Sequence, residues 1–125
     1  MPEAIRPPTI LIAEDDSGNY FLLNHYLKEF ECNTFRAENG WEAINTFKSK
    51  TNIDLVFMDI RMPVMDGIKA SEIIKSLNKD VPIIITTAFD YTDKEKEKLE
   101  EVCDKVVVKP ITHKIIKEIF IKFIQ

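Results

Sequence analysis

Residues 55–67 read Leu-Val-Phe-Met-Asp-Ile-Arg-Met-Pro-Val-Met-Asp-Gly, and this stretch decides the fold. Its first four residues are apolar, which is typical of a strand that is buried on both faces of a sheet. The strand reaches an acid, Asp59, and Pro63 then prevents further strand pairing because proline has no N–H to donate. Asp66 favours the start of a helix as its N-cap. The sequence therefore predicts a carboxylate at the C-terminal end of a buried strand, which is where ligands bind in open parallel sheets.

The rest of the chain repeats this order of a short apolar strand followed by a helix. Strands are predicted over residues 9–13, 33–37, 53–58, 81–88 and 105–108. Helices are predicted over residues 18–30, 41–50, 67–77, 92–102 and 111–124. Alternating strands and helices imply a parallel sheet with helices on both faces. Right-handed crossovers then favour a doubly wound, five-stranded, flavodoxin-like α/β fold with strand order 2-1-3-4-5.

The composition is that of one ordinary globular domain. The chain has 125 residues, of which 45% are hydrophobic and 30% are charged, and this is enough for one core. With 17 basic and 21 acidic residues the net charge is −4, so charge predicts no direct contact with nucleic acid. No apolar run is long enough to span a bilayer, so we expect a cytoplasmic domain without membrane contact. Residues 1–8 carry three prolines and are predicted to be a linker or cloning remnant before a domain over residues 9–125.

Polar side chains stand at the ends of four predicted strands. In chain order they are Glu14, Asp15, Asp59, Thr87 and Lys109. In the strand order 2-1-3-4-5 these four strands are neighbours, and the switch point lies between the first and the third. We therefore expect the side chains to line one crevice. Taken singly, each has a structural alternative: an acid that ends a strand, a threonine that favours strands, or a lysine whose ammonium reaches solvent.

The acids of this crevice predict a metal ion. Carboxylates crowded together raise each other's proton affinity unless a cation lies between them. A few hard oxygen ligands with room for water suit Mg²⁺ or Mn²⁺. The residues expected to provide those ligands are Glu14, Asp15 and Asp59.

The same side chains can handle a phosphoryl group. Asp59 can be the nucleophile, because a carboxylate attacks phosphorus without a separate base. Lys109 can neutralise one oxygen of the transferred group, and the Thr87 hydroxyl can donate a hydrogen bond to another.

These residues resemble the response-regulator receiver domain, and the resemblance extends from about Thr9 to Gln125. The motifs that carry it are Glu14-Asp15, Asp59 followed by Met62-Pro63 and Met65-Asp66-Gly67, Thr87-Ala88, and Lys109-Pro110. The resemblance implies a phosphoacceptor at Asp59, a switch hydroxyl at Thr87 and a phosphate-binding lysine at Lys109. It also implies metal binding by Glu14, Asp15, Asp59 and the backbone carbonyl of Arg61.

By the same resemblance, the domain takes its phosphoryl group from a histidine kinase or a histidine phosphotransfer protein in a two-component phosphorelay. Any catalysis is then Mg²⁺-dependent self-phosphorylation and dephosphorylation at Asp59. Tyr20 and Phe21 follow the acidic residues closely and are expected to form part of the partner's docking face. The alternative for these two aromatic residues is an ordinary place in the core.

Two further features refine the resemblance. Glu14-Asp15-Asp16 followed by Asn19, and Cys103-Asp104 before the last strand, are similar to receivers of hybrid histidine kinases. We expect no DNA-binding output domain after Gln125, and a hybrid-kinase receiver in preference to a stand-alone one. We also expect a monomer or weak homodimer. Many receivers carry an aromatic residue three places before the lysine, where this chain has Val106.

Two other functions fit the same fold. An aspartate-nucleophile phosphatase similar to the haloacid dehalogenase group needs a second aspartate two places after the nucleophile, where this chain has Arg61. A phosphorylation-independent interaction module or flavin binder needs no set of acids with Thr87 and Lys109. Phosphotransfer is therefore the leading hypothesis.

Overall fold

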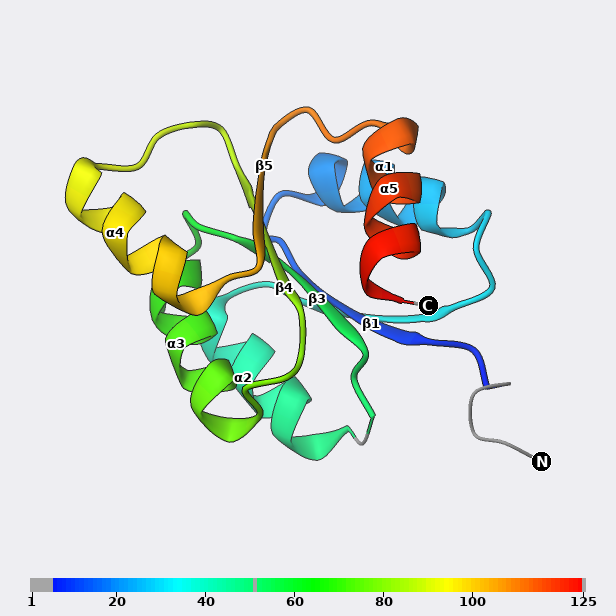
Figure 1. Ribbon diagram of the computed structural model, residues 1–125, viewed down its shortest axis with the longest axis horizontal. Coiled ribbons are helices and arrows are strands. Elements are labelled where there is room, and N and C mark those ends of the chain that lie inside the picture. Colours follow the sequence, from blue (N-terminus) through cyan, green and yellow to red (C-terminus); the bar gives the residue numbers. More distant parts are fainter. Residues whose placement is uncertain (1–5, 51, 125) are drawn as a thin grey trace.

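The computed structural model describes residues 6–50 and 52–124, and in this part of the chain five strands alternate with five helices (Figure 1). The strands are β1 (Thr9–Ala13), β2 (Asn33–Ala37), β3 (Leu55–Asp59), β4 (Ile83–Thr87) and β5 (Lys105–Val108). The helices are α1 (Ser17–Leu27), α2 (Gly40–Ser49), α3 (Gly67–Leu77), α4 (Asp93–Val102) and α5 (His113–Phe123). Every predicted element is present, with ends that differ by a few residues.

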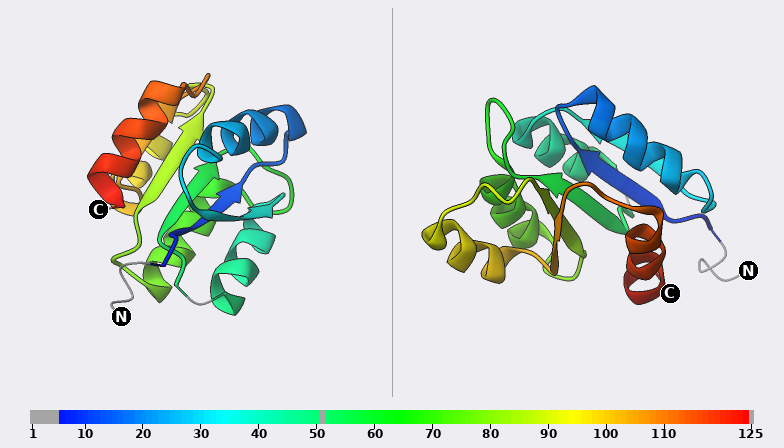
Figure 2. Two further views of the ribbon diagram at one scale, coloured as in Figure 1. Left: turned by 90° about the vertical axis from the view of Figure 1, so that its right-hand side faces the viewer. Right: turned by 90° about the horizontal axis from the view of Figure 1, so that it is seen from above.

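The strands form one parallel sheet in the order β2-β1-β3-β4-β5, which confirms the predicted doubly wound fold. Helices α1 and α5 cover one face, and α2, α3 and α4 cover the other (Figure 2). Because successive side chains of a strand point to opposite faces, β3 supplies both layers. Val56 and Met58 pack towards α2, α3 and α4, whereas Leu55 and Phe57 pack towards α1 and α5. Burial on both faces explains the continuous apolar runs of the sequence.

The start of the described chain is attached to the sheet. Residues 1–5 of the predicted linker lie outside the described residues. The Arg6 guanidinium makes two hydrogen bonds to the carboxylate of Asp54, at 2.9 and 3.0 Å. The Asp54 carboxylate also accepts the backbone N–H of Thr9, at 2.7 Å. Arg6 is thereby connected to the residues at which β1 and β3 begin. Among residues 6–50 and 52–124, no helix combines the length and apolar character needed to cross a membrane.

The helix that follows β3 begins almost in contact with the backbone of β3. Asp66 caps α3 by accepting the backbone N–H of Lys69 at 2.9 Å, as predicted. The N–H of Gly67 donates to the carbonyl of Ile60 at 2.8 Å. A Cβ atom at Gly67 would lie 1.8 Å from the carbonyl oxygen of Asp59, so this position has no room for any side chain. The close approach fixes the loop beside Asp59.

We predict that Gly67→Ala destabilises the domain and disturbs Asp59, because the added methyl group forces apart two packed backbone segments. Overpacking of this kind costs about 1–3 kcal/mol, to be measured by urea unfolding. Gly18→Ala is the matched control, because its new Cβ would meet a side-chain oxygen, Oδ2 of Asp16, at 3.2 Å, which needs a shift of only a few tenths of an ångström. Alanine is favoured over glycine by about 1 kcal/mol in helix interiors, and Gly18 lies in the first turn of α1, so Gly18→Ala should change stability much less than Gly67→Ala does. Equal stability of the Gly67→Ala variant and the wild type would contradict the close approach.

Candidate functional site

The C-terminal ends of β1 and β3 bring three acids together. Carboxylate oxygens of Glu14, Asp15 and Asp59 all lie within 4.8 Å of one another. Glu14 and Asp59 are buried, with 4% and 7% of their surfaces exposed, whereas Asp15 is exposed. The parallel order of the sheet explains this meeting, since β1 and β3 are neighbours that end at the same edge.

Lys109 reaches these acids from the far side of β4. Its ammonium Nζ lies 3.0 Å from Glu14 Oε1 and 3.4 Å from Asp59 Oδ1. Its backbone N–H donates to the carbonyl of Thr87 at 2.7 Å, which ties the loop after β5 to the end of β4. The peptide bond between Lys109 and Pro110 is cis. One half-buried cation thus contacts two buried carboxylates.

The charge balance of the crevice favours a proton or another cation at Asp59. Burial raises the pKa of Asp59 to about 7, and the negative charge of Glu14 adds to the rise, while Lys109 partly offsets both effects. Burial alone would lower the pKa of Lys109, but its contacts with Glu14 and Asp59 outweigh burial and raise that pKa. Lys109 therefore stays charged at neutral pH, and the crevice has a deficit of positive charge.

Thr87 lies at the end of β4 with its hydroxyl already engaged. Its side chain is fully buried. Oγ1 donates to Asp90 Oδ1 at 3.2 Å and accepts the backbone N–H of Phe89 at 3.2 Å. The sequence predicts a Thr87 hydroxyl available to a phosphoryl group, but it does not predict the hydrogen bond to Asp90.

Arg36 of β2 holds the loop that carries Glu14 and Asp15. Arg36 donates from Nε to the carbonyl of Glu14 at 3.2 Å and from Nη2 to the carbonyl of Asp15 at 3.4 Å. Its guanidinium also lies over the ring of Tyr20, 4.5 Å from the ring centroid. Asp16 points elsewhere and caps α1 by accepting the N–H of Asn19 at 2.8 Å. No motif in the sequence signals the role of Arg36.

Arg61 and Val106 mark the side of the site that faces α4. The predicted contribution of Arg61 is its backbone carbonyl, whereas the structure shows its guanidinium in a bidentate ion pair with Glu95 of α4, at 2.7 and 3.0 Å. The hydrogen bonds from Arg61 lower the pKa of Glu95 to about 2. Val106 lines a hollow of about 380 Å³ between α4 and β5, together with Tyr91, Leu99 and Cys103.

Comparison with known proteins decides the family. Residues 10–120 match the family described as response regulator receiver domain. The chain belongs to this family. It is therefore a receiver domain of two-component signalling, as the resemblance predicted.

One curated relative of this receiver domain is the autoinducer 1 sensor kinase/phosphatase LuxN of Vibrio campbellii, which is 34% identical over 105 residues. The match covers 84% of this chain but 12% of LuxN, so the receiver domain spans a small part of that relative.

Solved structures show the same fold. A receiver domain from Methanospirillum hungatei superimposes with a TM-score of 0.87 at 19% identity, and the match covers 94% of each chain. The receiver domain of the sensor histidine kinase PA1611 from Pseudomonas aeruginosa gives a TM-score of 0.85 at 24% identity over 95% of this chain and 98% of that one. The latter structure has a magnesium ion coordinated in its active site cleft.

The raised pKa of Asp59 predicts that, in metal-free protein, this residue lowers stability as the pH rises from about 4 to 7. The pKa of an aspartate in the unfolded chain is about 3.9, whereas the pKa of Asp59 in the folded protein is raised to about 7. Between these values the folded state binds more protons, so the free energy of unfolding falls as the pH rises.

Asp59→Asn has no such proton to lose. Its free energy of unfolding in urea with a chelator should exceed that of the wild type at pH 8 by roughly 1–3 kcal/mol, and the difference should shrink at pH 5. Asp15→Asn, which changes an exposed acid of the same cluster, is the control and should follow the wild-type profile much more closely. A constant difference between Asp59→Asn and the wild type across this range would refute the assignment.

Proposed function

We propose that this receiver domain accepts a phosphoryl group from a phosphohistidine onto the carboxylate of Asp59, with Mg²⁺ in the acidic crevice. The observation that carries the proposal is the position of Asp59, which is buried at the switch point of the sheet between Glu14 and Lys109. A buried acid surrounded in this way is a typical functional site, because its charge is held away from water by specific partners.

The reaction is one substitution at phosphorus. An oxygen of ionised Asp59 forms the new P–O bond while the P–N bond of the phosphohistidine breaks. The electron pair of the broken bond stays on the imidazole, which takes up a proton from solvent and leaves as neutral histidine. The product is an acyl phosphate on Asp59, and attack of water on its phosphorus returns the free carboxylate and inorganic phosphate.

The acidic crevice fits a small divalent cation. Glu14, Asp15 and Asp59 offer hard oxygen atoms within 4.8 Å of one another, which is the donor type that Mg²⁺ or Mn²⁺ prefers. The backbone carbonyl of Arg61 is proposed as a further ligand. When bound, the cation neutralises negative charge on Asp59 and on the phosphoryl oxygens. By opposing the effects of burial and of Glu14, this charge also favours the ionised, nucleophilic form of Asp59.

Lys109 and Thr87 complete the site in this proposal. The Lys109 ammonium already lies 3.4 Å from Asp59 Oδ1, so it is placed to neutralise an oxygen of a group attached there. Thr87 supplies a hydroxyl hydrogen to another oxygen once that hydroxyl leaves Asp90. Both residues act on charge that grows during the reaction, and neither moves a proton.

The proposal extends to the surroundings of the domain. A histidine kinase or histidine phosphotransfer protein is the proposed partner, and a hybrid sensor kinase in the cytoplasm is the proposed context, which the similarity to LuxN supports. The net charge of −4 supports a domain that does not itself bind nucleic acid. We propose a monomer or a weak homodimer.

The phosphatase alternative is weaker because of Arg61. The residue two places after the nucleophile would have to exchange a proton with the substrate. Here that residue is an arginine whose guanidinium is engaged by Glu95 and Asp90. Arginine keeps its proton at any ordinary pH, so it cannot be the acid and base of a turnover enzyme.

Acetyl phosphate and Mg²⁺ should phosphorylate the domain once, at Asp59. Intact mass spectrometry should show the mass of one added phosphoryl group in the wild type, and none in Asp59→Asn or in the presence of a chelator. Lys109→Met should slow the gain on the order of a hundredfold, because a charge-stabilising donor is lost. Phosphate gained by Asp59→Asn at another residue would overturn the assignment.

Phe21 should contribute to partner docking. Phe21 lies on α1 shortly after the acidic loop and is 64% exposed, so the alternative of a core position is wrong for this residue. Aromatic residues are enriched among the interface side chains whose truncation costs more than about 1 kcal/mol, which is roughly fivefold in affinity. Phe21→Ala should therefore slow transfer from a phosphohistidine protein while leaving transfer from acetyl phosphate unchanged.

The control for this experiment is Leu77→Ala. Leu77 is 48% exposed and lines a hollow with Arg6 and Asp54, at the opposite end of the sheet. Its truncation should affect neither donor. If Phe21→Ala slowed transfer from the phosphohistidine protein and from acetyl phosphate equally, this would indicate damage to the fold and not a lost docking contact.

A further inference from the structure

We propose that Arg61 is a positioning residue for the Asp59 site, because its guanidinium holds Asp90 in the place where Asp90 binds the Thr87 hydroxyl. We call the set Thr87, Asp90, Arg61 and Glu95 the Arg61 latch. The proposal rests on the proposed function, since it concerns the hydroxyl that serves the phosphoryl group. In its closed form the latch occupies that hydroxyl, so it sets how readily the site accepts a phosphoryl group.

The first part of the latch is the hydroxyl of Thr87. A hydroxyl has one hydrogen to donate, and Thr87 gives it to Asp90 Oδ1 at 3.2 Å. The same oxygen accepts the N–H of Phe89 at 3.2 Å, so both of its functions are used within the loop that follows β4. Thr87 is fully buried, so no water molecule from solvent can replace Asp90 as the acceptor of its hydroxyl hydrogen. Its donation to another group therefore requires the loss of the contact with Asp90.

The second part is the pair of contacts between the Arg61 guanidinium and Asp90. Nη2 of Arg61 donates to the backbone carbonyl of Asp90 at 2.5 Å, and Nε lies 3.6 Å from Asp90 Oδ2. Asp90 thus presents one carboxylate oxygen to Thr87 while the other lies next to a positive charge. A planar guanidinium with several donors fixes both the backbone and the side chain of such a residue.

The third part is the anchor on α4. Arg61 makes its bidentate contact with Glu95 at 2.7 and 3.0 Å, which is the stronger geometry for this ion pair. Glu95 also accepts the N–H of Thr92 at 2.9 Å, and Thr92 Oγ1 accepts the N–H of Glu95 at 3.1 Å, which completes a capping box. Arg61 therefore joins the loop after β3 to the first turn of α4.

The sequence of α4 makes this anchor important. The residues that α4 buries, Leu99 and Val102, lie in its second half. Its first turn is charged and holds its position through the cap and Arg61. A substitution of Arg61 is therefore expected to alter first the conformation of the loop after β4 and of the first turn of α4.

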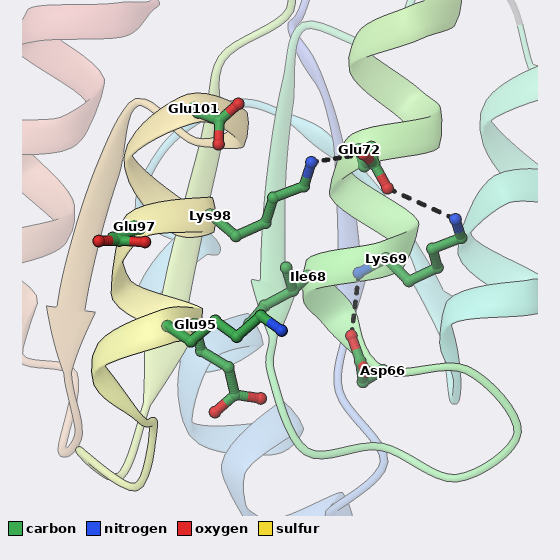
Figure 3. A pocket seen from close by; sticks show the side chains of 9 residues that line it. Asp66, Ile68, Lys69, Glu72, Glu95, Glu97, Lys98 and Glu101 are labelled. Carbon is green, nitrogen blue, oxygen red and sulfur yellow. Dashed lines mark hydrogen bonds and ion pairs between the residues drawn. The ribbon is translucent and has the colours of Figure 1, made fainter.

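A second attachment of α4 offers a matched control. Figure 3 shows the hollow of about 420 Å³ between α3 and α4, in which Lys98 reaches across to Glu72. Lys98 Nζ lies 2.6 Å from Glu72 Oε2, and both side chains are 39% exposed. This ion pair also joins α4 to its neighbour, but it has no contact with Thr87 or Asp90 among the described residues.

The test measures the beryllofluoride concentration that half-saturates the protein at fixed Mg²⁺, followed by the amide spectrum. Beryllofluoride is a stable mimic of the phosphoryl group on Asp59. Asp90→Ala should lower that concentration about tenfold, because Thr87 no longer has to leave a charged acceptor. Arg61→Met, which keeps the backbone carbonyl, should lower it about as much, because Asp90 is then no longer held in the place where it binds the Thr87 hydroxyl. In a Thr87→Val background, which has no hydroxyl, neither substitution should change the concentration.

Lys98→Met should leave the half-saturating concentration within about twofold of the wild type, since an exposed ion pair contributes little. In the absence of beryllofluoride, Arg61→Met should also speed hydrogen exchange at the amide of Lys96, which donates to Thr92 in the first turn of α4. A wild-type response that Arg61→Met and Asp90→Ala leave unchanged would overturn the positioning role alone. An equal gain in the Thr87→Val background would do the same. No response of the wild type would overturn the proposed function as well.

Discussion

The ammonium of Lys109 lies between two buried carboxylates, and the rest of the site depends on that contact. Glu14 directly follows β1 and Asp59 ends the neighbouring strand β3, and because both are buried their charges repel each other with little screening by water. One lysine offsets part of that repulsion and leaves an excess of negative charge. Burial raises the pKa of Asp59 to about 7, and the excess of negative charge adds to this rise and gives the crevice its affinity for a proton or a metal ion. The order β2-β1-β3-β4-β5 makes the contact possible, because it brings the ends of β1, β3 and β5 to one edge.

The backbone around the crevice is held in place by residues that do not themselves contact the reacting carboxylate. Gly67 lets α3 start against the carbonyl of Asp59, and Arg36 binds the carbonyls of the acidic loop from β2. On the other side, Arg61 connects the loop after β3 to α4. These contacts restrict the movement of the acids, and the part that leads to α4 is connected through the polar contacts of Arg61 with Asp90 and Glu95. A group added to Asp59 is expected to act on that part first.

The alternation of apolar strands and helices is enough to predict the fold, because strands that are apolar on both faces need helices on both sides of the sheet to cover them. The places of Glu14, Asp59, Thr87 and Lys109 follow from strand order, since each is fixed by the backbone at a strand end. The partners of Arg36 and Arg61 cannot be predicted in this way, because a long side chain takes its direction from contacts that arise only after folding. Phe21 shows the same limit: the sequence leaves both a docking position and a core position open for it, and only the packing of α1 on the sheet decides for the exposed one.

The most direct test of this account is the titration of the Asp59 carboxyl carbon by nuclear magnetic resonance, with and without Mg²⁺. Assignment by comparison with Asp59→Asn makes the signal unambiguous. The account predicts a pKa of about 7 in metal-free protein. It also predicts a clear fall in that pKa when Mg²⁺ is added, because a cation favours the charged form. A pKa near the ordinary aspartate value of about 3.9 that does not respond to Mg²⁺ would contradict it.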